Sequence, residues 1–303
     1  TQWLSPAQMQ DLIADITGEE AAGIGAELLS VQEGWQVTDI IEQSPAQNAG
    51  LAKGDLIVKI NGEPVGKVVW APEEGVTTLF TVQREGMTRD IVVIPQKIEP
   101  LPAIIVKTLP NGYGYIRIRS FVQEGMEDEF EKAMAQFSQA KGVIIDVRHN
   151  PGGRMDAVLT MLNGCLPDKT EVLCLLEAKG KEERYQTSGG QRYTMPMAVL
   201  TDGQSASAAE IFAGVLQNQG RALIVGDTTY GKGGVQKLKT LKDGSGLKYT
   251  MAEYRMADGT VIHEKGVAPD LKLTCNGLPG WAGTELEDIP LQTAVQALEA
   301  QQR

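Results

Sequence analysis

A change in hydrophobic periodicity near residue 97 most constrains how this 303-residue chain can fold. Before it, short apolar runs alternate with turn residues, which is typical of β-strands. These runs predict strands at residues 37–41, 55–60, 77–83 and 90–94, with a tight turn at Asn61-Gly62. After residue 97, apolar strands alternate with amphipathic helices. The chain therefore combines a small β-rich module with a larger α/β domain.

The larger part opens with a strand pattern at residues 113–121. A helix follows, because Met126, Phe130, Met134 and Phe137 recur at helical spacing. Further strands are expected at residues 142–147, 172–176, 197–201 and 222–225, and further helices at residues 154–162 and 205–219. This alternation predicts a layered α/β core.

The first residues have the pattern of an amphipathic helix. Ser5 is a favoured N-cap residue, Pro6 suits the first turn, and Met9 begins a run of apolar residues at helical spacing that ends before Gly18. We therefore expect an N-terminal helical segment at residues 1–22, the β-rich module at residues 23–96 and the α/β domain at residues 97–303.

Composition excludes several classes of function. With 28 Lys and Arg against 39 Asp and Glu, the net charge is -11, so nucleic acid is not an expected partner. Cys165, Cys174 and Cys275 form no CxxC pair and are too few and too scattered for a zinc cage or a disulfide framework, so they are expected to be buried small hydrophobic residues. No metal or other cofactor is expected. No apolar run is long enough to span a bilayer, and no secretion signal opens the chain at Thr1. These absences do not fix the compartment.

The segment TDGQSASAAEIFAGVLQNQG, at residues 201–220, runs from a strand end into a helix. Ser207 falls in the first turn of that helix, close to unpaired backbone N–H groups. A hydroxyl there can attack a carbonyl while neighbouring amides hold the developing oxyanion. Taken alone, Ser205 and Ser207 are more simply explained as helix caps.

Two further segments strengthen the catalytic interpretation. Residues 222–236, ALIVGDTTYGKGGVQ, lead from a strand into a glycine-flanked Lys232, whose ammonium could be disfavoured by an apolar environment. Residues 142–153, GVIIDVRHNPGG, lead from a strand into a glycine turn at the strand's carboxyl end, where α/β sheets bind ligands. A solvated lysine and an ordinary tight turn are the alternatives.

Together these segments resemble the carboxyl-terminal processing peptidases, or tail-specific proteases. The resemblance implies a core of the ClpP/crotonase-like type with Ser207 as nucleophile and Lys232 as general base. It also implies that Gln236 orients the lysine, and that Gly153 and Ala208 supply oxyanion amides. The segment GVAPD, at residues 266–270, resembles the family's closing motif.

The β-rich module resembles the family's inserted PDZ domain, with SPAQNAGL, KGD and NG as landmarks. By this resemblance Gly23, Ile24, Gly25 and Ala26 form the loop that binds a substrate's terminal carboxylate. Two departures stand out. Residues 64–75 replace the longer helix that forms one wall of the peptide groove, and Asn218 stands where some relatives carry an acidic residue.

Protein or peptide substrates with free carboxyl-terminal tails are therefore the expected partners. The resemblance also implies self-association into a homo-oligomer and a location outside the cytoplasm, in a bacterial periplasm or cell envelope. Two alternatives remain open. One is a non-catalytic scaffold or ligand-binding protein on the same fold; the other is a serine esterase with a histidine base, for which His149 is a better candidate than His263.

Overall fold

A computed structural model describes residues 2–6, 9, 22–67, 70–98, 102–177, 180–273 and 288–301, except the side chain of Gln236. The described residues divide into two compact units. One contains residues 22–98, and the other contains the first few residues together with residues 102–273 and 288–301. Of the predicted N-terminal helix, only Ser5, Pro6 and Met9 are described, and the Met9 amide donates to the Ser5 carbonyl at 2.8 Å.

The smaller unit is a β-sheet module, as the alternating pattern predicts. Its main sheet has the strand order β3-β4-β5-β7-β8, and β6 pairs with β5. The bounds are β3 Ala26–Val31, β4 Gly34–Ile40, β5 Leu56–Ile60, β6 Glu63–Pro64, β7 Thr78–Arg84 and β8 Met87–Val93. A short ladder joins β2 (Ala22–Gly23) to β9 (Gln96–Lys97), and a short helix, α2, spans Pro45–Ala49. The strands enclose their own apolar core around Val37, Ile57 and Phe80.

The larger unit is built on a sheet with the order β10-β11-β12-β15-β16-β19. The bounds are β10 Ile104–Thr108, β11 Gly114–Ile118, β12 Val143–Asp146, β15 Met197–Thr201, β16 Leu223–Gly226 and β19 Leu271–Lys272. All neighbours from β11 to β19 are parallel, and only β10 runs against its neighbour. Parallel strands need crossover connections, which explains the helices between them.

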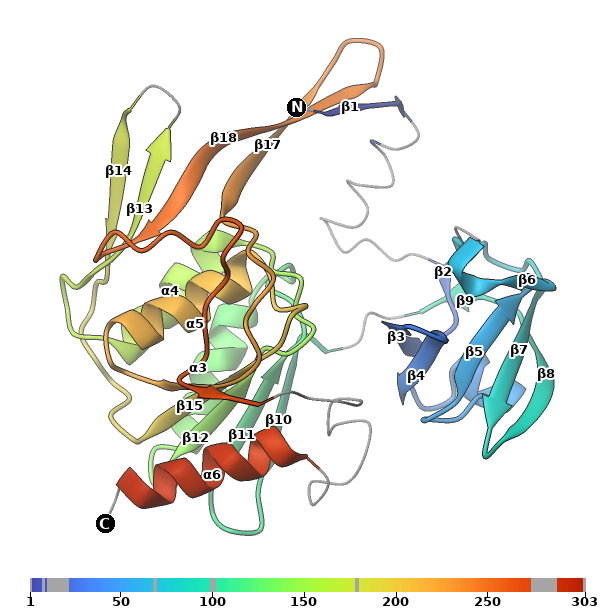
Figure 1. The fold of residues 1–303 in the computed structure, drawn as a ribbon, viewed down its shortest axis with the longest axis horizontal. Helices are drawn as coiled ribbons and strands as arrows, with labels where there is room; N and C mark the ends of the chain where they lie inside the picture. The colour runs from blue at the N-terminus through green and yellow to red at the C-terminus, as the bar shows by residue number, and fades with distance from the viewer. Residues whose placement is uncertain are drawn as a thin grey trace. The chain divides into compact units, whose positions relative to one another are not determined.

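Helices cover both faces of this sheet, as Figure 1 shows. Helices α3 (Met126–Gln136), α4 (Met155–Cys165) and α5 (Ala208–Asn218) lie on one face, and α6 (Ile289–Gln301) lies on the other. Successive β12 residues alternate between these layers: Val143 and Ile145 join the core of the first face, and Ile144 packs with α6. The continuous apolar run in β12 follows from burial on both faces.

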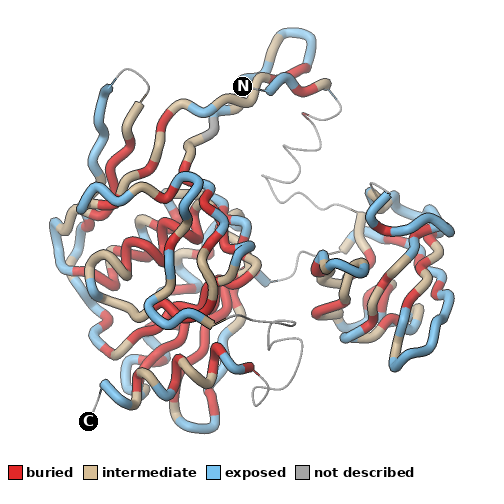
Figure 2. Tube along the Cα trace, in the orientation of Figure 1, coloured by how far each residue is buried: buried red, intermediate tan, exposed pale blue. Residues whose placement is uncertain are grey.

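A second sheet covers the outer side of α3–α5 (Figure 1). Its order is β1-β18-β13-β14, with β17 paired to β18. The bounds are β1 Gln2–Leu4, β13 Glu171–Glu177, β14 Glu182–Gln186, β17 Gly234–Thr240 and β18 Gly246–Met256. Leu173 of β13 and Tyr254 of β18 join the core around α5. Burial is therefore concentrated on α5 and the central strands, which appear red in Figure 2.

The layered α/β core and the separate β-rich module are confirmed. Because β12, β15 and β16 are parallel neighbours, the loops that follow them leave the sheet at the same edge. These loops carry the three segments singled out in the sequence. The edge therefore positions the candidate site.

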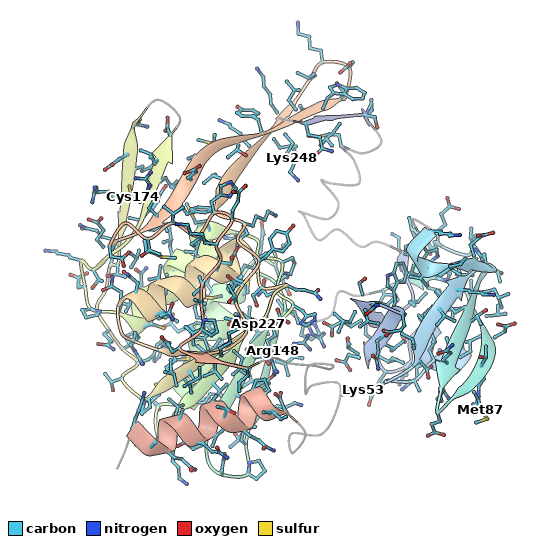
Figure 3. All side chains as sticks on the ribbon, viewed as in Figure 1. Lys53, Met87, Arg148, Cys174, Asp227 and Lys248 are labelled. Atoms are coloured by element: carbon cyan, nitrogen blue, oxygen red, sulfur yellow. The ribbon has the colours of Figure 1, made fainter. Side chains whose placement is uncertain are left out.

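A buried ion-pair network anchors α6 to the same edge. Arg148, labelled in Figure 3, follows β12 and donates to both Asp146 and Asp288, at 2.6 and 2.7 Å from one of its terminal nitrogens. All three side chains are buried. Asp288 also caps α6, because its carboxylate accepts from the Leu291 amide at 3.1 Å. Arg148 thus joins the end of β12 to the start of the carboxyl-terminal helix.

We predict that Asp288→Ala lowers the free energy of unfolding by about 3–5 kcal/mol, because it leaves the Arg148 charge without one of its two buried partners. Asp288→Asn should cost less, since the amide oxygen can still cap α6. Chemical denaturation checks both values. Glu299→Gln, which removes a carboxylate from the same helix, is the control and should change stability by less than about 0.5 kcal/mol. Equal stability of Asp288→Ala and the control would contradict the anchoring role.

Candidate active site

Ser207 lies at the junction between the loop after β15 and the first turn of α5. It is the N-cap residue of the helix and has φ 56° and ψ -116°, a left-handed conformation that non-glycine residues seldom adopt. Its side chain is half-buried. Strained backbone of this kind persists only where the surroundings enforce it, and it is concentrated at functional sites. The sequence placed Ser207 in the first helical turn; the structure places it one residue before the helix.

The buried carboxylate of Glu210 holds Ser207 and the lysine loop together. One oxygen, Oε2, accepts from the amides of both Ser207 and Lys232, each at 2.8 Å. The other, Oε1, accepts from the Thr229 hydroxyl at 2.6 Å and the Gly231 amide at 2.7 Å. Two loops that follow different strands therefore share one acceptor. Sequence reasoning missed this role, although a Glu at the third helical position after a Ser cap is a capping-box signal.

Lys232 lies in an environment that disfavours its positive charge. Partial burial lowers the pKa of the Lys232 ammonium, the like charge of Lys248 lowers it further, and Glu210 acts in the opposite direction. The net effect is a pKa below the ordinary value of 10.5. The residue keeps an exposed surface, so its ammonium is partly desolvated and still reachable. Figure 3 labels Lys248, which lies in β18 opposite Leu238 of β17.

The glycine turn after β12 packs directly against the start of α5. A Cβ on Gly152 would lie 2.8 Å from the Ser207 Cβ and 2.9 Å from the Ala208 nitrogen, so only glycine fits there. Its neighbour Gly153 forms an isolated bridge with Phe121. Among the described residues, the amides of Gly153 and Ala208 donate to no protein acceptor. Both predicted amides are therefore uncommitted and lie in the turn and helix start that meet at Ser207.

Asn150 locks this turn in place, and sequence reasoning did not single it out. Its side-chain oxygen accepts from the Gly152 amide at 2.8 Å, and its carbonyl accepts from the Ala206 amide at 2.9 Å. Its amide group donates to the Ile118 carbonyl at 2.9 Å. A fully buried amide with donors and acceptors both satisfied fixes the turn relative to two neighbouring strands.

His149 pairs with Asp202 beside the same turn. The His149 Nδ1 lies against the Asp202 carboxylate, and the His149 amide donates to that carboxylate at 3.0 Å. Burial alone would raise the pKa of Asp202, but the hydrogen bond and charge of His149 outweigh burial and lower it. The hydroxyl of Ser205 donates to the Val147 carbonyl at 2.8 Å. Ser205 therefore braces the loop and does not cap α5.

The two remaining sequence predictions near the site have different outcomes. Gln236 lies in β17 opposite Thr250, four residues after Lys232, but its side chain lies outside the described atoms. Its orienting role remains a prediction. Asn218 is the last residue of α5, which places it roughly 16 Å from Ser207 at about 1.5 Å per helical residue. The departure at Asn218 therefore does not affect the site.

The predicted carboxylate loop of the smaller unit has the conformation of a tight turn before an edge strand. Gly25 has φ 74°, and a Cβ there would lie 2.3 Å from the Ser44 Cβ, so the turn requires glycine. The Ile24 and Gly25 amides have no protein acceptor within the described ranges. Gly23 pairs with Gln96, and Ala26 begins β3, which borders the sheet.

Residues 64–75 are the segment where the resemblance places the longer helix of the groove wall. Their described part contains one short 3₁₀ turn, Val65–Lys67, and no α-helix. Trp70 packs edge-on against Phe80, with ring centroids 5.1 Å apart, and lies 6.1 Å from the Trp35 ring. Trp70 and Trp35 thus cover part of the module's apolar core. Beside it, a pocket of about 250 Å³ is lined by the β3–β4 turn and residues 64–66.

The thiols and acidic groups offer no other chemistry in the described part of the chain. No cluster of His, Cys, Asp or Glu side chains there could hold a metal ion. Cys165 and Cys174 are buried, as expected, and burial raises the pKa of Cys165 to about 12, which keeps the thiol protonated. Cys275 lies outside the described residues. None of the described helices is long and apolar enough to cross a membrane.

Comparison with known sequences gives the same pattern. The model for peptidase family S41 matches residues 112–273, and a PDZ domain model matches residues 36–69. The carboxy-terminal processing protease CtpB of Bacillus subtilis is 33% identical over 264 residues, which cover 83% of this chain and 55% of that protein. A probable CtpA-like serine protease of Staphylococcus aureus is 33% identical over 286 residues, 90% of this chain and 56% of the relative. The chain thus spans about half the length of these relatives.

Solved structures share the fold. The photosystem II D1 C-terminal processing protease superposes with a TM-score of 0.66 at 25% identity, covering 94% of this chain and 80% of that one. A putative S41 protease from Bacteroides fragilis gives a TM-score of 0.69 at 16% identity, covering 93% and 84%. The predicted resemblance is confirmed, and because the family model alone matches more than half of the sequence, the chain belongs to peptidase family S41.

Proposed function

We propose that the protein is a serine endopeptidase of the carboxyl-terminal processing type, with Ser207 as nucleophile and Lys232 as general base. The observation that carries the proposal is the Glu210 carboxylate, which accepts from the amides of both residues through the same oxygen. A shared acceptor of this kind keeps the backbones of a nucleophile and a base at a fixed separation. Membership of family S41 supports the reaction class.

The lysine can act as a base because its charged form is disfavoured. Partial desolvation and the Lys248 charge increase the fraction of Lys232 that is neutral near physiological pH. A neutral amine can accept the proton of the Ser207 hydroxyl. No histidine is needed for that step.

The reaction then follows the usual course of acyl transfer. The Ser207 Oγ attacks the scissile carbonyl carbon while its proton moves to the Lys232 Nζ. The amides of Gly153 and Ala208 hold the oxyanion, and its collapse breaks the C–N bond as Lys232 returns the proton to the leaving amine. Water, deprotonated by Lys232, hydrolyses the acyl enzyme and regenerates Ser207. Gln236 would orient the lysine through its amide.

The smaller unit would deliver the substrate. The Ile24 and Gly25 amides can bind a terminal carboxylate, and the free edge of β3 can pair with the tail as an added strand. Because residues 64–75 leave the groove wall short, main-chain and carboxylate contacts should dominate over side-chain contacts. Protein or peptide chains with free carboxyl-terminal tails are the proposed substrates.

A second candidate function rests on the His149–Asp202 pair, which resembles two members of a Ser-His-Asp site. In that case the protein would be a histidine-dependent serine hydrolase. A scaffold without catalysis is the third candidate function.

From the family alone we also infer self-association and a location outside the cytoplasm. Light scattering can test the first, and cell fractionation can test the second.

The test of the proposed function is digestion of an unfolded protein, with fragments identified by mass. Wild type should cleave it, and Ser207→Ala should be inactive with a stability within about 1 kcal/mol of wild type, because Glu210 still caps the Ser207 amide. Lys232→Arg should be as inactive as Lys232→Ala, since a guanidinium cannot accept a proton. Cleavage by Ser207→Ala would remove the site, and loss of activity in His149→Ala but not Lys232→Ala would favour the second candidate.

Glu210→Gln should lower kcat/KM by about 100-fold, because the amide replaces one acceptor oxygen with a donor facing backbone N–H groups. Stability should fall by about 1–3 kcal/mol, the cost of unsatisfied buried groups. Glu264→Gln, an exposed carboxylate in a neighbouring loop, is the matched control. Wild-type kinetics in Glu210→Gln would show that the link is not needed for catalysis.

Lys248→Met should raise the pKa of Lys232, because a like charge is removed. Since neutral Lys232 is the active form, activity rises with pH through this pKa. The acidic limb of the kcat/KM profile should therefore move to higher pH while the alkaline plateau stays. Lys239→Met, an exposed lysine of the same hairpin, should leave the profile in place. An unchanged profile in Lys248→Met would refute this electrostatic coupling.

Tail capture predicts that peptides with a free apolar carboxyl terminus bind more tightly than their amides. The full-length Ser207→Ala variant, titrated calorimetrically, avoids cleavage during the measurement. Amidation should weaken binding by about 10-fold or more, the scale of a hydrogen bond to a charged group. Substitutions upstream in the tail should cost less. Equal binding of acid and amide would remove tail capture and leave the Ser/Lys chemistry unaffected.

A further inference from the structure

Tyr230, two residues before Lys232, exposes an aromatic ring at the candidate active site. Its exposed fraction is 68%, the largest among the large hydrophobic residues that the structure describes as exposed. Single exposed apolar residues are common on protein surfaces and need no function. The position of Tyr230 and the rigidity of its backbone distinguish it from such residues.

The backbone around Tyr230 is held on every side. The Tyr230 amide donates to the Ser205 carbonyl at 3.0 Å, which ties the loop to the segment before Ser207. Both flanking residues are buried, and both donate to Glu210, Thr229 through its hydroxyl and Gly231 through its amide. The ring is therefore exposed although hydrogen bonds order the loop that carries it.

The same contacts place the backbone of Tyr230 close to both proposed catalytic residues. The carbonyl that holds Tyr230 belongs to Ser205, two residues before the proposed nucleophile, and Tyr230 itself precedes the proposed base by two residues. Among the described side chains no aromatic partner packs on the ring. Tyr230 therefore carries an exposed ring without an aromatic partner, on a loop that is hydrogen-bonded to the Ser205 carbonyl and, through Gly231 and Lys232, to Glu210.

We propose that Tyr230 is a specificity-determining residue, whose ring packs against an apolar side chain of the substrate close to the scissile bond. The inference rests on the proposed peptidase function. Aromatic rings can bury 150–250 Å² of surface, as an order of magnitude, so covering a mostly exposed ring favours apolar residues over polar ones. The ring face makes this contact, and the hydroxyl is not required.

The test compares Tyr230→Ala and Tyr230→Phe with wild type on peptides that share one cleavage site. At each position within two residues of the scissile bond, the series carries either Leu or Ser. We expect wild type to prefer Leu at one of these positions, Tyr230→Phe to keep that preference, and Tyr230→Ala to lose it. The loss should be about 10- to 100-fold in kcat/KM on the Leu peptide, with little change on the Ser peptide.

Two controls separate substrate contact from a structural effect. The rate at which a small fluorophosphonate labels Ser207 should be the same in wild type and Tyr230→Ala, because the probe does not reach the ring. Trp3→Ala, another exposed aromatic, should keep the preference. If Tyr230→Ala retains the wild-type preference, or loses the same factor on every peptide, the inference is wrong while the proposed function stands. Absence of Ser207-dependent cleavage by wild type would overturn both.

Discussion

The geometry of the candidate active site depends on one buried carboxylate. Glu210 accepts four hydrogen bonds from two loops, and its side chain has no exposed surface. A buried carboxylate is costly unless its oxygens are fully satisfied, so the favourable arrangement is the one in which both loops close on it. The backbones of Ser207 and Lys232 are thereby brought to the same oxygen. The left-handed conformation of Ser207 is held by the same contacts, which offset its strain.

The parallel strand order of the main sheet brings the remaining parts of the site together. The loops after β12, β15 and β16 leave the sheet at one edge, so the glycine turn, the serine and the lysine converge although they are distant in sequence. Asn150 then fixes the turn against α5, and Arg148 joins the same strand end to Asp288 of the last helix. Each of these buried polar groups links segments from different strands. Buried hydrogen bonds and ion pairs therefore hold the backbone of the candidate site to the core.

Much of this was predictable from local pattern. The strand predicted at residues 197–201 matches β15, because it is a continuous apolar run, and the helix predicted from Met126 matches α3, because its apolar residues recur at helical spacing. Glu210 and Arg148 were missed because their partners are set by tertiary structure: the Arg148–Asp288 contact joins residues 140 apart. The β17–β18 hairpin was missed because its lysines obscure the alternation. Helix α6 carried a usable signal in Leu291, Ala294, Val295 and Leu298, which lie at helical spacing and pack on the sheet.

The central proposal is that the partly desolvated Lys232 activates Ser207. Its most direct test is the pH dependence of covalent labelling by a fluorophosphonate, with the modified residue located by peptide mass mapping. Labelling should occur at Ser207, rise with pH through a single midpoint below 10.5, and be lost in Lys232→Met. Labelling at another residue, or labelling of Ser207 that is unchanged in Lys232→Met, would contradict the claim.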